Sequence, residues 1–192
     1  MDDFSTPPVS TGSAVRAVLI GAAAGAAATV VMTGAMLALQ RAGLLGRMPP
    51  RLIVEHALAR FGVQRRTSRG TRKALALAAH LGFGASQGAV YALGHALAAK
   101  RGHAPNPNFA TGVPFALAVW AVNYAGWIPK VGIMPPPSRD RMGRPTSMIL
   151  AHVVYGATLA AILKPALGSG GAPAAPQGKP RGVSLIGGGR SS

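Results

Sequence analysis

Four long stretches of the 192-residue chain contain no charged side chain. They cover residues 17–40, 74–99, 102–129 and 145–163, and they are 24, 26, 28 and 19 residues long. A helix rises about 1.5 Å per residue, so about 20 apolar residues cross the hydrocarbon core of a bilayer. A soluble amphipathic helix would carry charges on its outer face, and these stretches carry none. The pattern therefore predicts an all-α, four-helix integral membrane bundle rather than a soluble alanine-rich helical domain.

The remaining residues divide the chain into two predicted transmembrane hairpins. We expect helices over about 14–39, 74–98, 110–128 and 146–164, the last of them closed by Lys164 and Pro165. Residues 14–98 form the first hairpin, with a basic loop at 40–73 that holds a short interfacial helix near 51–61. Residues 110–164 form the second hairpin. Polar residues 1–13 and the Gly- and Pro-rich tail 165–192 are predicted to be disordered.

Two phrases occur twice and in the same order. "GRMPP" at 46–50 matches "GIMPP" at 132–136, and "AHLGFGA" at 79–85 matches "AHVVYGA" at 151–157. Each hairpin is therefore interpreted as one copy of a helix, proline turn and helix, so that the bundle consists of two tandem repeats. Pro49 and His80 are 31 residues apart, against 17 for Pro135 and His152, which marks the arginine-rich segment as an insertion in the first copy. As structure, Pro-Pro stops a helix and starts an extended exit.

The net charge of +16 at first suggests a nucleic-acid partner, but the positions of the charges point to membrane orientation. Nine basic residues lie in the first loop and four in the third, against Lys100 and Arg101 in the second. The excess of Lys and Arg on the cytoplasmic side of membrane proteins places the proline turns in the cytoplasm and both termini outside. We expect no nucleic-acid partner and a bilayer with anionic headgroups, which would bind the basic cluster of Arg65, Arg66, Arg69, Arg72 and Lys73.

Five polar side chains fall within the predicted membrane helices, where they cost free energy and are therefore candidates for function. They are His80, Gln87, His95, Asn123 and His152. An imidazole that hydrogen-bonds across a close helix contact stabilises packing by about 1 kcal/mol and needs no ligand. A proton or ion pathway through His80 and His152 is the alternative, since imidazole titrates near neutral pH.

Small residues recur on the helix faces beside the histidines. The second and fourth helices place Gly84, Gly88 and Gly156 one and two turns after a histidine, and the first helix holds Gly21 and Gly25. Such faces let helix backbones come close. The two histidine faces are expected either to meet each other or to cradle the first and third helices. Faces of this kind also predict self-association, so that a homo-oligomer is a possible partner.

Several kinds of chemistry are excluded by the residues present. The chain has no cysteine, and two histidines without a nearby carboxylate neither close a zinc site nor supply a base. Haem ligation by two histidines is disfavoured as well, and no nucleophile or phosphate-binding motif is found. We therefore expect no metal, no cofactor and no enzymatic activity.

The doubled pattern of a proline-pair turn followed by Ala-His and an aromatic residue resembles the YagU-like group of bacterial inner-membrane proteins and its four-helix relatives. The matching positions are Pro49, Pro50, His80, Pro135, Pro136, His152 and Tyr155. The resemblance implies a multi-pass protein of the cytoplasmic membrane without established enzymatic activity, in a group associated with acid resistance. The arginine-rich first loop and the long tail depart from that group. The sequence thus favours a non-enzymatic structural or stress-related membrane component, with a small proton, ion or solute transporter or channel as the alternative.

Overall fold

The computed structural model of the protein describes residues 11–102 and 106–168, and within these ranges all regular structure is helical, as predicted. The helices are α1 (Thr11–Arg41), α2 (Pro49–Arg60), α3 (Arg69–Lys100), α4 (Phe109–Trp120), the π-helix η2 (Ala121–Trp127), α5 (Ile128–Lys130) and α6 (Arg144–Gly168), with short 3₁₀ turns at η1 (Gln64–Arg66) and η3 (Pro137–Arg139). Since α4, η2 and α5 follow one another without a gap, they form one continuous rod.

Three of the described helical segments are long and apolar enough to cross a membrane, which fits a membrane protein. They are Gly12–Arg41, Phe109–Lys130 and Arg144–Leu167. The 32-residue α3 is not among them, because its charge-free part is rich in Ala and Gly and also contains His, Gln and Ser, which lower its hydropathy.

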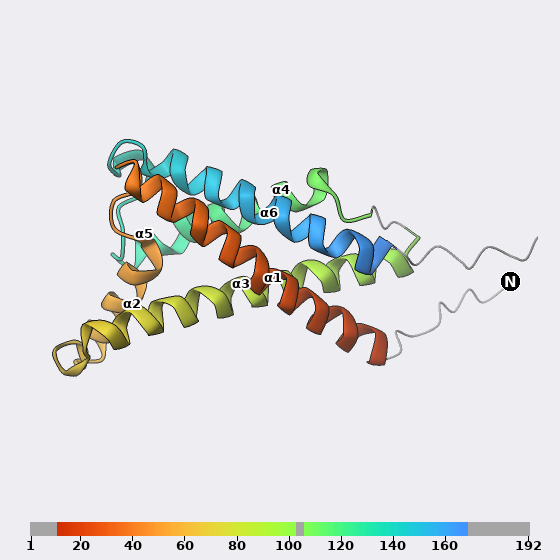
Figure 1. Cartoon of the computed structure of the whole chain (residues 1–192), viewed down its shortest axis with the longest axis horizontal. Coiled ribbons are helices and arrows are strands. Elements are labelled where there is room, and N and C mark those ends of the chain that lie inside the picture. Colours follow the sequence, from red (N-terminus) through yellow and green to blue (C-terminus); the bar gives the residue numbers. More distant parts are fainter. Residues whose placement is uncertain (1–10, 103–105, 169–192) are drawn as a thin grey trace, which may run out of the picture.

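The rods are arranged as a sequence of neighbours rather than as a closed square. α1 crosses α3 and also lies along α6, and α6 in turn packs on the α4 rod (Figure 1). The chain enters the second and fourth rods from the end where α2 lies, so that both proline turns share that end of the molecule (Figure 1). The first residues of α1 and the last residues of α6 lie at the opposite end of the molecule (Figure 1).

The helix boundaries differ from the predicted ones at several points. α3 begins at Arg69 rather than at 74, because the Ser68 side chain caps it by accepting a hydrogen bond from the backbone N–H of Thr71 at 3.1 Å. The prediction that the last helix stops at Lys164 is wrong, since Pro165 lies inside α6. α1 begins at Thr11, within the predicted disordered lead. The expected disorder of 1–10 and 169–192 lies outside the described residues.

The two proline turns share their glycine and methionine but not the path of their prolines. Gly46 and Gly132 have positive φ angles of 70° and 76°, a left-handed conformation that explains why glycine precedes both turns. Met48 and Met134 both pack into or against the core. Pro49 and Pro50, however, are the first residues of α2, so the expected extended exit is wrong for the first turn. Pro136 in the second copy is extended, as expected.

A buried ion pair joins the two turns. Arg144 Nη1 lies 3.0 Å from Asp140 Oδ1, and the two side chains are only 10% and 2% exposed. Arg144 also donates from Nε to the carbonyl oxygen of Leu45 at 3.0 Å, in the loop after α1. Tyr124 of η2 donates its hydroxyl to Asp140 Oδ2 at 2.5 Å. This cluster, the Arg144 clamp, fixes both loops and η2 to the start of α6.

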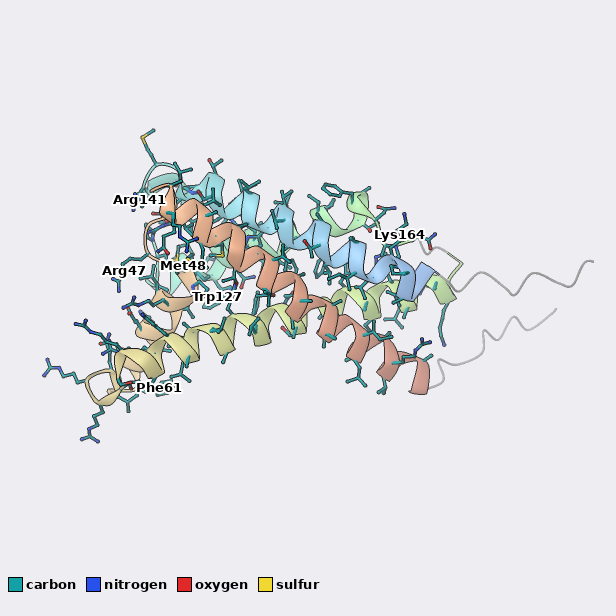
Figure 2. All side chains as sticks on the ribbon, in the orientation of Figure 1. Arg47, Met48, Phe61, Trp127, Arg141 and Lys164 are labelled. Carbon is teal, nitrogen blue, oxygen red and sulfur yellow. The ribbon has the colours of Figure 1, made fainter. Side chains whose placement is uncertain are left out.

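The end with the proline turns is strongly basic. Figure 2 shows Arg47 and Arg141 there, while the labelled Lys164 lies toward the other end. Glu55 on α2 accepts hydrogen bonds from Arg51 Nε at 2.7 Å and Arg47 Nη2 at 2.5 Å. The hydrogen bond from Arg51, with a smaller effect from the charge of Arg47, holds the pKa of Glu55 below its ordinary value, although burial opposes the shift. Glu55 therefore neutralises part of α2 and contributes no free carboxylate.

Candidate functional site

Two glycine crossings set the positions of the helices around the site. Where α1 crosses α3, a Cβ on Gly25 would collide with the carbonyl oxygen of Gly84, and one on Gly88 would collide with that of Gly21. Backbone is thus in contact with backbone, which only glycine permits. These four predicted packing residues therefore serve contacts within one chain.

The second crossing joins α4 to α6. A Cβ on Gly156 would collide with the carbonyl oxygen of Gly112, and Ala116 and Ala160 flank the contact. The two histidine-bearing helices therefore pack mainly on other helices, α3 on α1 and α6 on α4, rather than on each other. Gly112 was not among the packing residues predicted from the sequence.

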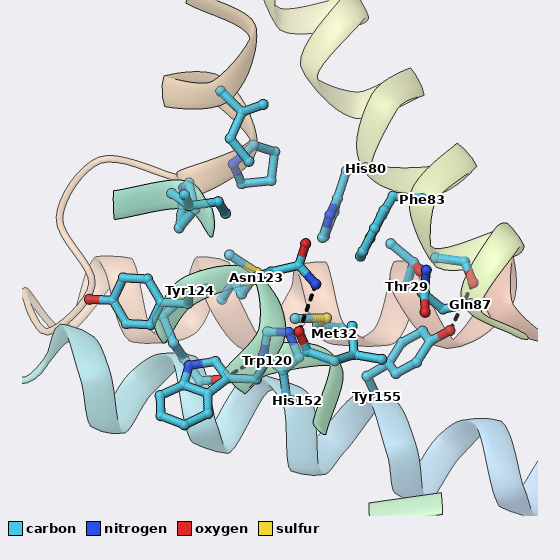
Figure 3. A pocket seen from close by; sticks show the side chains of 18 of the residues that line it. Thr29, Met32, His80, Phe83, Gln87, Trp120, Asn123, Tyr124, His152 and Tyr155 are labelled. Carbon is cyan, nitrogen blue, oxygen red and sulfur yellow. Dashed lines mark hydrogen bonds between the residues drawn. The ribbon is translucent and has the colours of Figure 1, made fainter. Parts of the chain in front are cut away.

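A cavity of about 340 Å³ lies between α1, α3, η2 and α6, with the start of α2 at one end. Figure 3 shows the imidazole of His80 and the ring of Phe83 extending from α3, and His152 and Tyr155 from α6. Tyr155 donates its hydroxyl to the carbonyl oxygen of Gly84 at 2.8 Å and so ties α6 to α3 beside the cavity. Apolar and aromatic side chains form most of the wall, and among the described residues no Asp, Glu, Lys or Arg lines it.

The two cavity histidines are held differently. His152 Nδ1 lies 2.7 Å from the carbonyl oxygen of Met148, and because a carbonyl only accepts, Nδ1 is the donor. In the neutral ring this leaves His152 Nε2 as a hydrogen-bond acceptor. His80 Nε2 is buried and has no hydrogen-bond partner within the described parts of the chain. The hydrogen-bonding capacity of this nitrogen is therefore not used by the described residues.

The π-helix η2 presents a third set of groups to the cavity. Asn123 Nδ2 donates to the carbonyl oxygen of Val119 at 2.6 Å, and its Oδ1 accepts from Trp127 Nε1 at 2.8 Å. Trp120 Nε1, one turn before Asn123, is buried and has no partner among the described residues. π-helical turns often occur at functional sites. No feature of the sequence predicted this one.

The cavity opens between α3 and η2. Phe83 on α3 and Trp127 on η2 both line it, and these two residues remain 43% and 44% exposed. α3 does not pack along η2 as it packs along α1. The opening is therefore on the side of the bundle, which is the surface that faces lipid if the rods span a bilayer.

The structure brings four of the five predicted polar residues to this cavity. His80, Gln87, Asn123 and His152 line it, whereas His95 does not. His95 packs against Tyr91, with ring centroids 4.5 Å apart. It lies 15 residues after His80, about 22 Å along the helix. The site thus includes His80 and His152 and excludes His95.

The basic cluster predicted to bind lipid headgroups lies around the start of α3. Arg65, Arg66, Arg69 and Lys73 are exposed. Arg72 is half-buried and donates from Nε to the carbonyl oxygen of Thr67 at 3.1 Å. None of these basic residues lines the cavity, so the cluster is a separate surface.

The chemistry available at the cavity is binding and hydrogen bonding. Within residues 11–102 and 106–168 no group of three or more His, Cys, Asp or Glu side chains is placed to hold a metal ion. The cavity instead combines an apolar and aromatic wall with a few polar side chains, which is the usual composition of a site for a small organic molecule.

The comparisons with known proteins give a family but no activity. No curated protein and no solved structure matches the chain. The resemblance to the YagU-like group remains a resemblance. The model of a family of unknown function, DUF6789, matches residues 15–169. Because the match covers most of the 192 residues, the chain belongs to the DUF6789 family.

Proposed function

We propose that the protein is a non-enzymatic, multi-pass membrane component that holds a small, uncharged, lipid-soluble guest in the cavity between α3 and η2. The observation that carries this proposal is a cavity of about 340 Å³ whose wall is mostly apolar and aromatic. Among the described residues no charged side chain lines the cavity, which favours an uncharged guest because an unpaired ion is costly to bury.

We propose that α3 crosses the membrane as a fourth span. Residues 74–99 of α3 carry no charge, and its central face is in backbone contact with α1, which is itself a candidate span. A helix fixed to α1 in this way shares its surroundings along the crossing. The charges at the start of α3 then lie at the membrane surface with α2.

We further propose that the bundle consists of two tandem repeats. Gly25 meets Gly84 as Gly112 meets Gly156, and Gly84 and Gly156 each lie four residues after a histidine, His80 or His152. The two turns also share a left-handed glycine. Equivalent contacts at equivalent positions are expected from a duplicated hairpin and have no reason to recur otherwise.

For orientation, we propose that the proline turns are cytoplasmic and that the protein lies in a bacterial cytoplasmic membrane with both termini outside. The nine basic residues of 41–73 and the four of 130–144 lie at one end of the bundle, which supports this assignment. Anionic headgroups are the partner proposed for that end. Nucleic acid is not proposed, because the charge is accounted for by this arrangement.

Cysteine labelling tests the orientation without a background signal, since the chain has no cysteine. In intact cells a membrane-impermeant maleimide should label Asn106→Cys, in the loop before α4, and leave Ser138→Cys in η3 unlabelled until the cells are opened. Both positions are exposed. Labelling of Ser138→Cys alone in intact cells would refute the orientation.

A homo-oligomer also remains a proposal, but its interface must lie away from the glycines expected to form it. Gly21, Gly25, Gly84 and Gly88 are covered by contacts within one chain. Gly82 and Gly94 of α3 have open space where a Cβ would be, so they are better candidates for a contact with a second copy.

Guest binding is tested through the two tryptophans, Trp120 and Trp127, which both line the cavity. Bromobenzene is an apolar quencher of tryptophan emission, and it should quench the protein in lipid nanodiscs with a saturable curve. Ala79→Phe should remove the saturable part, because Ala79 lines the cavity and a phenyl ring would fill it. Ala78→Phe is the matched control, since Ala78 is an exposed neighbour outside the lining. Equal curves for the two variants would exclude binding in this cavity.

A transporter remains the second candidate, because His80 and His152 line one cavity. It differs from simple binding in requiring flux across the membrane. A pH-dependent flux in liposomes that His80→Ala and His152→Ala abolish would establish transport, and unchanged flux in both variants would end it.

A further inference from the structure

The cavity is a slot that runs along the bundle. Its lining extends over residues 79–87 on α3 and 148–155 on α6, a length of about 10–12 Å at the rise of a helix. A volume of about 340 Å³ spread over that length leaves a mean width of about 5–6 Å. Packed carbon atoms lie about 4 Å apart, so the slot takes one row of methylene groups but not two rows side by side.

The polar groups of the wall do not require a polar guest. Thr29 Oγ1 donates to a carbonyl oxygen of its own helix at 2.8 Å. The amide of Asn123 and the hydroxyl of Tyr155 are hydrogen-bonded within the chain as well. The ring nitrogens His80 Nε2 and Trp120 Nε1, which have no partner among the described residues, are buried beneath neighbouring atoms and are not presented to the slot. Apolar contact is therefore what the wall offers.

Four methionines give the wall an adaptable surface. Met32 and Met36 come from α1, Met134 from the second proline turn and Met148 from α6. The methionine side chain is unbranched and flexible, so it fits irregular contents. Such a wall suits a flexible chain that takes up several conformations in the slot.

The slot opens sideways in the half of the bundle that ends in the proline turns. Pro49 and Pro50 of α2 and Met134 of the second turn lie at one end of the lining. The opening lies between Phe83 and Trp127, which are 43% and 44% exposed. With the rods spanning a bilayer as proposed, this opening faces the acyl chains of the leaflet on that side. Those chains are the most abundant alkyl groups within reach of the slot.

We propose that one acyl chain of a bilayer lipid enters the slot through this opening, while the head group of the same lipid stays outside at the membrane surface. This inference rests on the proposed function and adds the chemical class of the guest, an unbranched alkyl chain. The charge or polarity of the head group does not enter the cavity, which is consistent with the apolar wall. The chain is bound without covalent change.

The shape of the guest is tested by competition with bromobenzene in lipid nanodiscs. Trp127→Phe keeps an aromatic ring at the opening and leaves Trp120, in the lining, as the single tryptophan of the chain. The competitors are n-dodecane and cyclododecane, which have the same number of carbon atoms and a similar preference for lipid. Cyclododecane is a closed ring two methylene rows, or about 8 Å, across. It is therefore wider than the slot.

We expect n-dodecane to displace bromobenzene from the slot and cyclododecane to leave it in place. With n-dodecane at about twice its own dissociation constant, the bromobenzene concentration that gives half of the saturable quenching should rise about threefold. The same amount of cyclododecane in the membrane should leave that concentration unchanged. The wild-type chain, with both tryptophans in the lining, gives the same comparison should Trp127→Phe fail to fold.

The source of the chain is tested with a phospholipid that carries bromine in the middle of one acyl chain. It is added at a low fraction to nanodiscs of unbrominated lipid, and the emission of Trp120 is measured in the Trp127→Phe protein. Quenching should reach a plateau at a low fraction of brominated lipid with Ala78→Phe, because Ala78 is exposed and outside the lining. Ala79→Phe fills the slot, so quenching should then rise only in proportion to that fraction.

The outcomes separate this inference from the proposed function. Equal effects of n-dodecane and cyclododecane, whether displacement or none, would overturn the alkyl-chain assignment and leave the apolar site of the proposed function. Displacement by n-dodecane alone, together with equal lipid quenching in Ala78→Phe and Ala79→Phe, would show that the slot takes free alkyl compounds and would overturn the bilayer lipid as the source. Unsaturable quenching by bromobenzene would overturn both the inference and the proposed function.

Discussion

Replacing Arg144 with alanine should destabilise the protein by about 3–5 kcal/mol, because it leaves the carboxylate of Asp140 buried without its partner. Asp140 is 2% exposed, and Arg144 is the side chain that pairs with it. The substitution also removes the hydrogen bond to Leu45, so the two turn loops lose a direct link. Unfolding in mixed detergent micelles, followed by circular dichroism, measures the change in free energy.

Arg141→Ala is the matched control for this prediction. Arg141 is exposed and donates one hydrogen bond, to the carbonyl oxygen of Gly43 at 3.0 Å, so its loss should cost no more than about 1 kcal/mol. A double variant with Arg144→Met and Asp140→Leu should recover much of the loss, because it replaces the buried pair with apolar side chains. If Arg141→Ala and Arg144→Ala were equally destabilising, the Arg144 clamp would have no special role.

Replacing Gly84 with leucine should separate α1 from α3. A Cβ at this position would overlap the Thr29 side chain, and Gly25 lies directly behind it, so the helices must move apart. Overpacking a core costs typically about 1–3 kcal/mol, and a contact that forces two backbones apart is expected at or above the top of that range. The same detergent unfolding assay applies.

Gly82→Leu makes the same chemical change two residues earlier on the same helix. Gly82 has open space where its Cβ would be, so the substitution should alter stability by less than about 1 kcal/mol. The pair separates packing from helix propensity and hydrophobicity, because both variants gain the same side chain. A similar loss in both would show that the glycine crossing does not hold α3 in place.

The sequence predicted the helices well where charge marked their limits, and less well where capping decided them. Charge-free runs indicated the four rods because a buried or lipid-facing surface excludes charge. The start of α3 was missed, since Arg69 and its neighbours suggested a loop while the Ser68 cap began the helix. Pro165 was expected to end α6, yet it lies within the last turns, where the helix continues.

The sequence predicted most of the polar residues of the candidate site but not the cavity that they line. The repeat paired His80 with His152, and the structure places both on one cavity. The cavity itself was not predictable. It lies where α3 and η2 do not pack closely, whereas the spacing of apolar and small residues along the sequence indicates only the faces that do pack. The π-helix that turns Asn123 and Trp127 toward each other left no signal in the sequence for the same reason.

The most direct test of the account is the bromobenzene titration of the wild-type protein in lipid nanodiscs. Both tryptophans line the cavity, so their emission reports on that site without a background from other indoles. We predict quenching that rises to a plateau as the cavity fills. Quenching that increases without limit, as for a tryptophan peptide dissolved in the same lipid, would contradict the central claim that this bundle holds a guest.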